Sequence, residues 1–270
     1  MNLYDEFVRL LAQQPAVLVR VQRVRGSAPR EVGAWMAVFP QTVVGTVGGG
    51  RLEWDATAHA RTLLQQGAQA PGVVRYPLGP RLGQCCGGEM TLEYRPVGLA
   101  DAAALQPSLC PPGMPVALFG AGHVGRALVR VMAALPVQVR WVDSRDEVFA
   151  TPVPDNVQCE HSDPVQAAVA DLVPHTRVLI MSFSHAEDLD VVGACLQRQR
   201  VHADLPFVGL IGSQTKWATF QHRLRTRGFT DAELSRVTCP IGVPGIQDKR
   251  PEVIAVGVAA QLLQTLSPDS

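Results

Sequence analysis

The sequence lacks an excess of charge, a long apolar run and a leader-like start. Twenty-four basic residues cancel 24 acidic ones, so no global field draws a polyanion, and nucleic acid is not expected as a partner. No apolar run approaches the ~20 residues that cross a bilayer. The first six residues contain acids where a signal peptide would be basic. We therefore expect a cytoplasmic protein that contacts neither nucleic acid nor membrane.

The sequence also lacks the spacing of a zinc site. It has six cysteines, but no second Cys or His pair stands at finger or ribbon spacing. In a reducing compartment these cysteines are expected to be free thiols, metal ligands or reaction centres rather than disulfides. An apolar fraction of 47% over 270 residues is enough to build a core in one large or two ordinary domains.

Two regions of different pattern flank residues 98–114, where prolines cluster and a linker is predicted. Residues 1–97 contain short valine-rich runs and one helical pattern near 52–66, which predict a small α+β domain. Residues 115–270 alternate apolar strands with helices. This pattern predicts an α/β fold with a Rossmann-like, doubly wound parallel sheet. The predicted strands of this half cover 115–120, 137–143, 157–161, 177–183 and 206–212; the predicted helices cover 123–135, 163–172, 187–199, 214–227 and 251–266.

A glycine turn joins the first strand and helix of the second half. Gly120, Gly122 and Gly125 have the spacing of a dinucleotide-binding turn, which holds a phosphate at the helix start. Asp143 ends the next strand, where an acid usually binds a ribose hydroxyl. His123 lies inside the turn and either contacts the ligand or caps the helix. The alternative is that the glycines serve turn geometry alone.

The loops after the later strands are expected to face the same crevice. His185 follows one strand and is a candidate ligand contact, and Lys216 follows another. A hydride-transfer enzyme would need a proton donor of this kind, but no spacing argues for either residue.

A second glycine turn, in the first half, also leads from a strand into a helix. Gly48, Gly49 and Gly50 allow the backbone to approach a ligand closely. Arg51 adds a cation suited to phosphate. A polar turn of similar character lies at 26–33. The competing interpretation is that these residues form tight turns only.

Cys85 and Cys86 stand side by side between glycines. Adjacent Cα atoms lie ~3.8 Å apart, below the ~4.4–6.8 Å of relaxed disulfides, so the pair is expected to be reduced. Thiolates suit soft metals and sulfur transfer, which makes both residues candidate metal ligands; buried structural thiols are the alternative. Four other cysteines stand alone and are expected to be buried: Cys110, Cys159, Cys195 and Cys239.

Taken together, the motifs resemble those of the XdhC family, the xanthine dehydrogenase accessory proteins. The most specific segment is the cysteine segment at 78–88, and Gln261 departs from the glutamate expected in the last helix. The other matching segments lie at 26–38, 45–53, 116–128, 141–149, 207–216 and 240–260.

The resemblance implies a non-catalytic carrier of molybdenum cofactor. Such a protein keeps the cofactor while a cysteine desulfurase supplies its sulfido ligand, then passes it to apo xanthine dehydrogenase. The resemblance also implies a homodimer. In this interpretation Cys85 and Cys86 ligate molybdenum or assist sulfur exchange, and a glycine turn holds the phosphate end of the cofactor.

Two other hypotheses remain open from the sequence. One is an NAD(P)-dependent oxidoreductase built on residues 114–270, motivated by the dinucleotide-type turn and Asp143. The other is a purely structural scaffold for the dehydrogenase complex.

Overall fold

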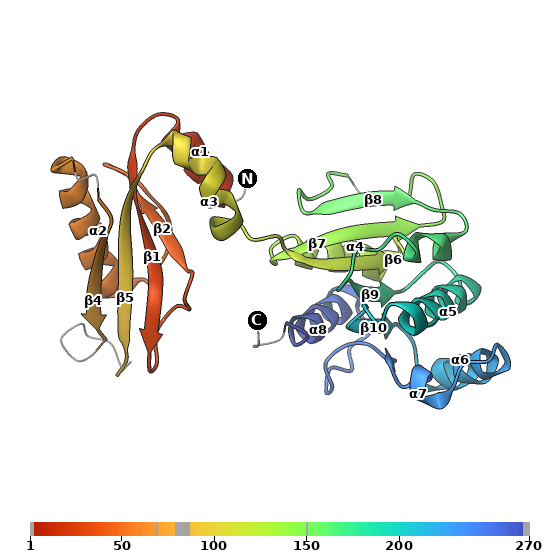
Figure 1. Cartoon of the computed structure of the whole chain (residues 1–270). Coiled ribbons are helices and arrows are strands. Elements are labelled where there is room, and N and C mark those ends of the chain that lie inside the picture. Colours follow the sequence, from red (N-terminus) through yellow and green to blue (C-terminus); the bar gives the residue numbers. More distant parts are fainter. Residues whose placement is uncertain (1–2, 68–69, 79–86, 150, 267–270) are drawn as a thin grey trace. The chain divides into compact units, whose positions relative to one another are not determined.

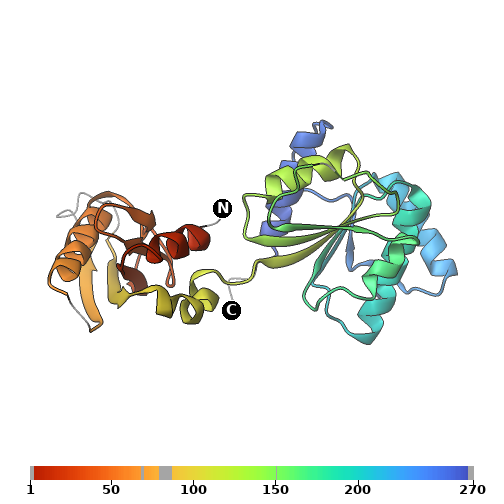
Figure 2. The same ribbon diagram turned by 90° about the horizontal axis from the view of Figure 1, so that it is seen from above.

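The structure is a computed structural model that describes residues 3–67, 70–78, 87–149 and 151–266. The chain divides into two compact units, Met1–Pro111 and Pro112–Ser270. Both appear in Figures 1 and 2. Each unit is built around its own sheet and is described by itself.

The first unit is a five-stranded antiparallel sheet with the strand order β3-β2-β1-β5-β4. The short valine-rich runs form the predicted strands, because β-branched side chains pack well on a pleated surface. The strands are β1 (Ala16–Arg25), β2 (Trp35–Val38), β3 (Val43–Gly45), β4 (Gly72–Pro77) and β5 (Glu89–Val97). The helices are α1 (Leu3–Leu11), α2 (Gly50–Gln65), the 3-10 turn η2 (Leu99–Asp101) and α3 (Ala102–Leu109).

Helices cover both faces of this sheet (Figure 1). On one face, Leu52, Ala56 and Ala60 of α2 are buried against the strands. On the other face, α1 and α3 pack around the fully buried Phe7. The helical pattern predicted near 52–66 is confirmed by α2.

The predicted linker over 98–114 is largely helical. Leu105 and Leu109 of α3 are buried in the same apolar cluster as α1, and the indole Nε1 of Trp35 donates a hydrogen bond to the Leu109 carbonyl at 2.9 Å. The apolar residues of α3 recur at helical spacing, so burial favours the helix despite the internal Pro107. The first unit therefore extends well past residue 97.

The second unit is a six-stranded parallel sheet with the order β11-β10-β9-β6-β7-β8. This is the order of doubly wound dinucleotide-binding sheets, with the switch point between β6 and β9. The strands are β6 (Met114–Phe119), β7 (Val137–Asp143), β8 (Val157–His161), β9 (Arg177–Ile180), β10 (Phe207–Leu210) and β11 (Val237–Thr238). The helices are α4 (His123–Met132), η3 (Val165–Val169), α5 (His185–Val201), α6 (Gln214–Thr226), α7 (Asp231–Leu234) and α8 (Pro251–Leu263).

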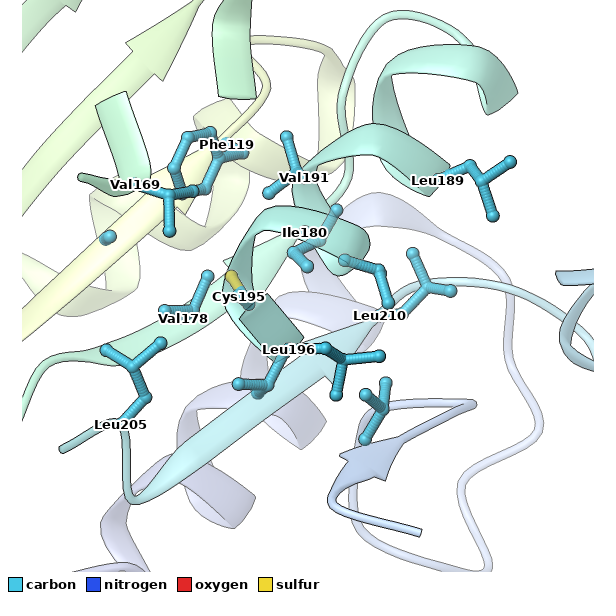
Figure 3. Packing of buried hydrophobic residues seen from close by; sticks show 14 of the residues in the cluster. Phe119, Val169, Val178, Ile180, Leu189, Val191, Cys195, Leu196, Leu205 and Leu210 are labelled. Atoms are coloured by element: carbon cyan, nitrogen blue, oxygen red, sulfur yellow. The ribbon is translucent and has the colours of Figure 1, made fainter. Parts of the chain in front are cut away.

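Apolar clusters lie on both faces of the parallel sheet, as expected for strands without alternation. One cluster joins the sheet to α4 and α8, and the other joins it to η3, α5 and α6. Figure 3 shows the thiol of Cys195 among the apolar side chains of the second cluster. Burial raises the pKa of this thiol to about 12, so Cys195 serves packing.

The remaining differences from the predicted elements are small. The helix expected over 163–172 is only the 3-10 turn η3, and α7 and β11 lacked a sequence signal. Cys110 is exposed rather than buried. No helix within the described parts of the chain has the length and apolar character needed to cross a membrane.

The packing of α3 predicts a stability effect. Replacing Leu105, which is 7% exposed, by alanine should lower the free energy of unfolding by about 2–4 kcal/mol through lost burial and a cavity. Leu99→Ala is the matched control, since Leu99 is 52% exposed. Urea unfolding followed by circular dichroism makes the measurement. If both substitutions lowered the free energy of unfolding by the same small amount, α3 would not contribute to the core and the segment would act as a linker.

Candidate functional site

Three loops meet at one end of the antiparallel sheet, which we call the loop end. They are the β1–β2 connection (26–34), the β3–α2 connection (46–49) and the β4–β5 connection (78–88). The register places them there, because Arg25 at the end of β1 lies opposite Glu89 at the start of β5. The polar turn at 26–33, the glycine turn at 46–49 and the described ends of the cysteine loop, Leu78 and Gly88, are therefore neighbours.

Close backbone approaches hold the three loops together. A Cβ added at Gly88 would lie 2.3 Å from the carbonyl oxygen of Ser27, and one added at Gly48 would lie 2.5 Å from Cγ of Pro29. Neither distance leaves room for a side chain. The turn at 26–33 is thus packed between the base of the cysteine loop and the second glycine turn.

Cys85 and Cys86 lie outside the described residues, so their role stays a prediction. The base of their loop is described. The amide of Leu78 donates a hydrogen bond to the carbonyl of Gly88 at 2.7 Å. The cysteine loop therefore leaves the sheet and returns to it at a single hydrogen-bonded pair.

The glycine turn of the first unit encloses one of the chain's own carboxylates. Oε2 of Glu53 accepts hydrogen bonds from the amides of Val47 and Gly49, both at 3.1 Å, and from the hydroxyl of Thr46. The turn needs glycine, with φ of +134° at Gly48 and +71° at Gly49. These amides, which the sequence suggested for a bound anion, already have an acceptor.

Arg51 also has partners within its own helix. Its Nε lies 3.1 Å from Oδ1 of Asp55, and its guanidinium stacks 4.7 Å from the centroid of the Trp54 ring. Gly50 opens α2 with φ of +61°. Ligand binding by Gly48, Gly49, Gly50 or Arg51 stays a prediction.

In the second unit, the three glycines of the turn have the geometry of a phosphate-binding turn. Gly120 has φ of +114°, and a Cβ there would lie 2.0 Å from the carbonyl oxygen of Met181. A Cβ at Gly125 would lie 2.1 Å from the carbonyl of Gly120, whereas the space around Gly122 is open. The tight turn, the helix packing and the open approach expected from the sequence are all present. His123 is exposed at the start of α4.

Asp143 is not free to bind a ribose. Its Oδ2 accepts hydrogen bonds from the amide of Ala121 at 2.6 Å and from Nη2 of Arg145 at 2.9 Å. Its Oδ1 accepts from the amide of Arg145 at 3.0 Å and from Nε at 2.9 Å. A carboxylate has about four acceptor positions, and here they are filled. Burial acts to raise the pKa of Asp143, but the hydrogen bonds from Arg145 and Ala121 outweigh it and hold that pKa below its usual value.

Arg145 and Phe183 face each other across the edge of the crevice between the loops after β7 and β9. The guanidinium lies 4.3 Å from the ring centroid, and Phe183 is 64% exposed. Glu187 ties the same loops together, because it accepts hydrogen bonds from the Ser144 hydroxyl at 2.8 Å and the Phe183 amide at 3.1 Å. Sequence reasoning missed Arg145, although its position two residues after Asp143 was a usable signal.

Lys216 forms a buried ion pair with Asp188. Its Nζ lies 2.6 Å from Oδ2 of Asp188 and donates to the carbonyl of Ile211 at 2.9 Å. Asp188 is 2% exposed and also accepts from the amide of Ser182 at 2.7 Å. Lys216 therefore holds two loops of the crevice in place, which leaves it poorly suited to proton transfer.

His185 begins α5 and is exposed. Its ring lies edge-on to that of Phe220, 6.3 Å between centroids. It accepts and donates no hydrogen bond within the described part of the chain. A role of His185 in ligand binding stays a prediction.

Gln261 stands in the last helix where the family resemblance led us to expect a glutamate. Its Oε1 accepts a hydrogen bond from the amide of Gly242 at 2.7 Å. A glutamate can accept the same bond, so the substitution keeps this contact and removes a charge. No group of three or more potential metal ligands occurs among the residues that the structure describes.

Comparison with known proteins matches both units to one family. The XdhC Rossmann domain matches residues 116–262, and the XdhC and CoxI family matches residues 10–77. The first match alone covers more than half of the 270 residues. The chain belongs to the XdhC family.

Two relatives of the XdhC chain bear on its fold and length. The uncharacterized protein YqeB of Escherichia coli is 26% identical over 272 residues, covering 98% of this chain and 46% of YqeB. The chain thus spans about half the length of that curated relative. A crystal structure described as a xanthine dehydrogenase from Bacillus halodurans matches with a TM-score of 0.81 and 21% identity, over 100% of this chain and 97% of that one. This likeness supports the fold.

The bonds to Asp143 predict a pH-dependent effect on stability. Asp143→Asn should lower the free energy of unfolding at neutral pH by about 1–3 kcal/mol, because charged hydrogen bonds in a buried site are lost. The folded-state pKa lies below the unfolded one. The contribution is therefore complete above the unfolded value of ~3.9 and is lost as pH falls through the folded-state pKa.

Urea unfolding of the wild type and of Asp143→Asn, at pH 7 and at decreasing pH, measures the gap between their free energies of unfolding. The gap should shrink only at acid pH. Asp231→Asn is the control, because Asp231 forms an ion pair with Arg225 while its side chain is 80% exposed. A gap that stays constant into the acid range would show that the Asp143 carboxylate does not supply the stabilisation.

Proposed function

We propose that this XdhC-family chain is an accessory protein of xanthine dehydrogenase that carries molybdenum cofactor. It binds the cofactor as cargo, holds it while a cysteine desulfurase supplies the sulfido ligand, and inserts it into the apo enzyme. In this proposal the chain acts in the cytoplasm as a homodimer and performs no catalysis itself. Family membership supports the link with xanthine dehydrogenase.

One observation carries the assignment of the cargo site to the first unit. The base of the cysteine loop packs directly against a glycine turn, through the close approach of Gly88 to Ser27. Adjacent thiols are soft donors suited to molybdenum and to sulfur exchange. The backbone is open at Gly49 and Gly87, since a Cβ at either position would meet no atom of the described residues within 4 Å. This combination suits a bulky ligand that meets both sulfur and backbone.

The phosphate end of the cargo needs donors other than the amides that Glu53 occupies. The first turn of α2 offers backbone amides, which favour an anion by about 0.3–1 kcal/mol at exposed sites. Gly122 in the second unit offers an open approach of the same kind. The proposal leaves both as candidates for the phosphate.

The direct test of the proposal is to measure the cofactor that the purified protein carries. The protein is purified from a host that makes molybdenum cofactor, and the released oxidised pterin and the bound molybdenum are assayed. Wild type should carry pterin in a near-stoichiometric amount. Cys85→Ala and Cys86→Ala should each lower it about tenfold or more, the order of loss expected when a group that holds a metal is removed.

Cys110→Ala is the matched control, because Cys110 is an exposed lone cysteine in the same unit. It should carry wild-type amounts of pterin. Unchanged pterin, molybdenum and activation of apo xanthine dehydrogenase in both variants of the pair would remove the cysteines from the mechanism. Size-exclusion chromatography of the same samples tests the homodimer.

A second candidate function, an NAD(P)-dependent oxidoreductase, is favoured by the strand order and the open glycine turn. The filled carboxylate of Asp143 argues against it. Arg145→Ala tests this point, because it frees two acceptor positions on Asp143 for a ribose. NAD⁺ should bind the variant at least about tenfold more tightly than the wild type, the gain expected from one or two charged hydrogen bonds. Tight, saturable NAD⁺ binding by the wild type would favour the oxidoreductase instead.

A further inference from the structure

A cavity of about 590 Å³ lies beside α4 in the second unit, and we call it the α4–α8 cavity. Its volume falls within the ~300–1,000 Å³ of small-molecule sites. None of its lining residues comes from the loops after β9 or β10, and His123 is the one lining residue that it shares with the Gly120 turn. Its walls come from α4, β7, the segment before β8 and the start of α8: His123, Arg126, Val129, Arg130, Trp141, Thr151, Pro152, Pro154, Pro251 and Glu252.

Two arginines and a histidine line the cavity along one face of α4. His123, Arg126 and Arg130 follow at spacings of three and four, which places them on the same side of the helix. Arg130 has no hydrogen-bond or ion-pair partner among the described residues. The cavity therefore offers an unneutralised guanidinium to an anion.

Arg126 is held in a fixed position. Its Nε donates to the carbonyl of Ala121 at 3.1 Å, and its Nη2 donates to the carbonyl of Val148 at 2.8 Å. These bonds leave Nη1 for a ligand. A guanidinium fixed by two carbonyls loses little freedom on binding, which favours affinity.

The rest of the lining is apolar, with one carboxylate. Pro152 and Pro154 offer an apolar wall to a flat ring, and the buried Trp141 and Val129, which are 1% and 4% exposed, lie behind it. Glu252 is exposed and accepts no hydrogen bond from any described residue. A carboxylate binds best to a pair of adjacent N–H donors. The lining is thus complementary to a molecule that has both an anionic group and an edge with adjacent N–H donors.

We propose that the α4–α8 cavity binds a planar heterocycle that has adjacent ring N–H and amino donors and an anionic substituent. Guanine nucleotides and anionic pterins share this chemistry. Arg130 and Arg126 take the anion, and Glu252 takes the donor edge. A pterin occupant would give the proposed cargo a second anchoring point, but the inference does not rest on the carrier role.

The test is calorimetric titration of the whole chain with three probes: GMP, 6-carboxypterin and AMP. GMP and 6-carboxypterin carry the donor edge, and AMP lacks it. GMP or 6-carboxypterin should bind saturably, and AMP should bind about tenfold or more weakly than GMP, because adenine offers Glu252 an amino donor beside a ring nitrogen that cannot donate. The tighter of the first two probes identifies the source of the ligand.

Two variants separate the two ends of the ligand. Arg130→Ala should weaken the binding of GMP and of AMP by the same factor of about tenfold, because both nucleotides carry the phosphate. Glu252→Ala should weaken the binding of GMP but not of AMP, so the variant should bind the two nucleotides with similar affinity. Both side chains are exposed, so thermal melts should match wild type. Arg223→Ala, an exposed arginine on α6, is the control and should bind like wild type.

Equal binding of GMP and AMP, or GMP binding that survives Arg130→Ala unchanged, would overturn the proposal. So would flat titrations with both GMP and 6-carboxypterin. These outcomes are distinct from failure of the carrier role, which is read from the cargo of the cysteine variants.

Discussion

Close approach of one backbone to another is the constraint on which both candidate sites depend. In the second unit, Gly120 lies so near Met181 that the loops after β6 and β9 meet at the switch point. In the first unit, Gly88 lies against Ser27 and brings the cysteine loop to the glycine turns. A single methyl group at Gly88 or Gly120 would overlap a carbonyl oxygen and force the loops apart. The glycines thus set the spatial relation of the loops before any ligand arrives.

Both units also use their own carboxylates where a ligand was expected. Glu53 accepts hydrogen bonds from amides of the glycine turn at 46–49, and Asp143 accepts them from the Ala121 amide of the Gly120 turn and from Arg145. The loops are thereby ordered without cargo, at the cost of donors that would otherwise face it. This arrangement leaves other groups to hold any ligand that binds. It argues against a tightly held dinucleotide at Asp143.

Much of the fold was predictable from residue patterns, since β-branched runs, apolar strands and the Gly120 turn are local signals. The helix α3 was not, because Pro107 and its neighbours resemble a linker, and only the burial of Leu105 against α1 reveals a helix. For the candidate site, sequence placed Asp143 at its strand end. The capture of Asp143 by Arg145 depends on side-chain directions that spacing alone does not specify.

The single hydrogen-bonded pair at the base of the cysteine loop, Leu78 to Gly88, separates two roles along the chain. The ladder between β4 and β5 is complete up to Pro77 and Glu89, so its register does not depend on what lies between. Residues can be added or removed within the loop without shifting any strand, at a closure cost that grows slowly with length. A change of sequence between Leu78 and Gly88 therefore leaves the strand pairing of this sheet in place.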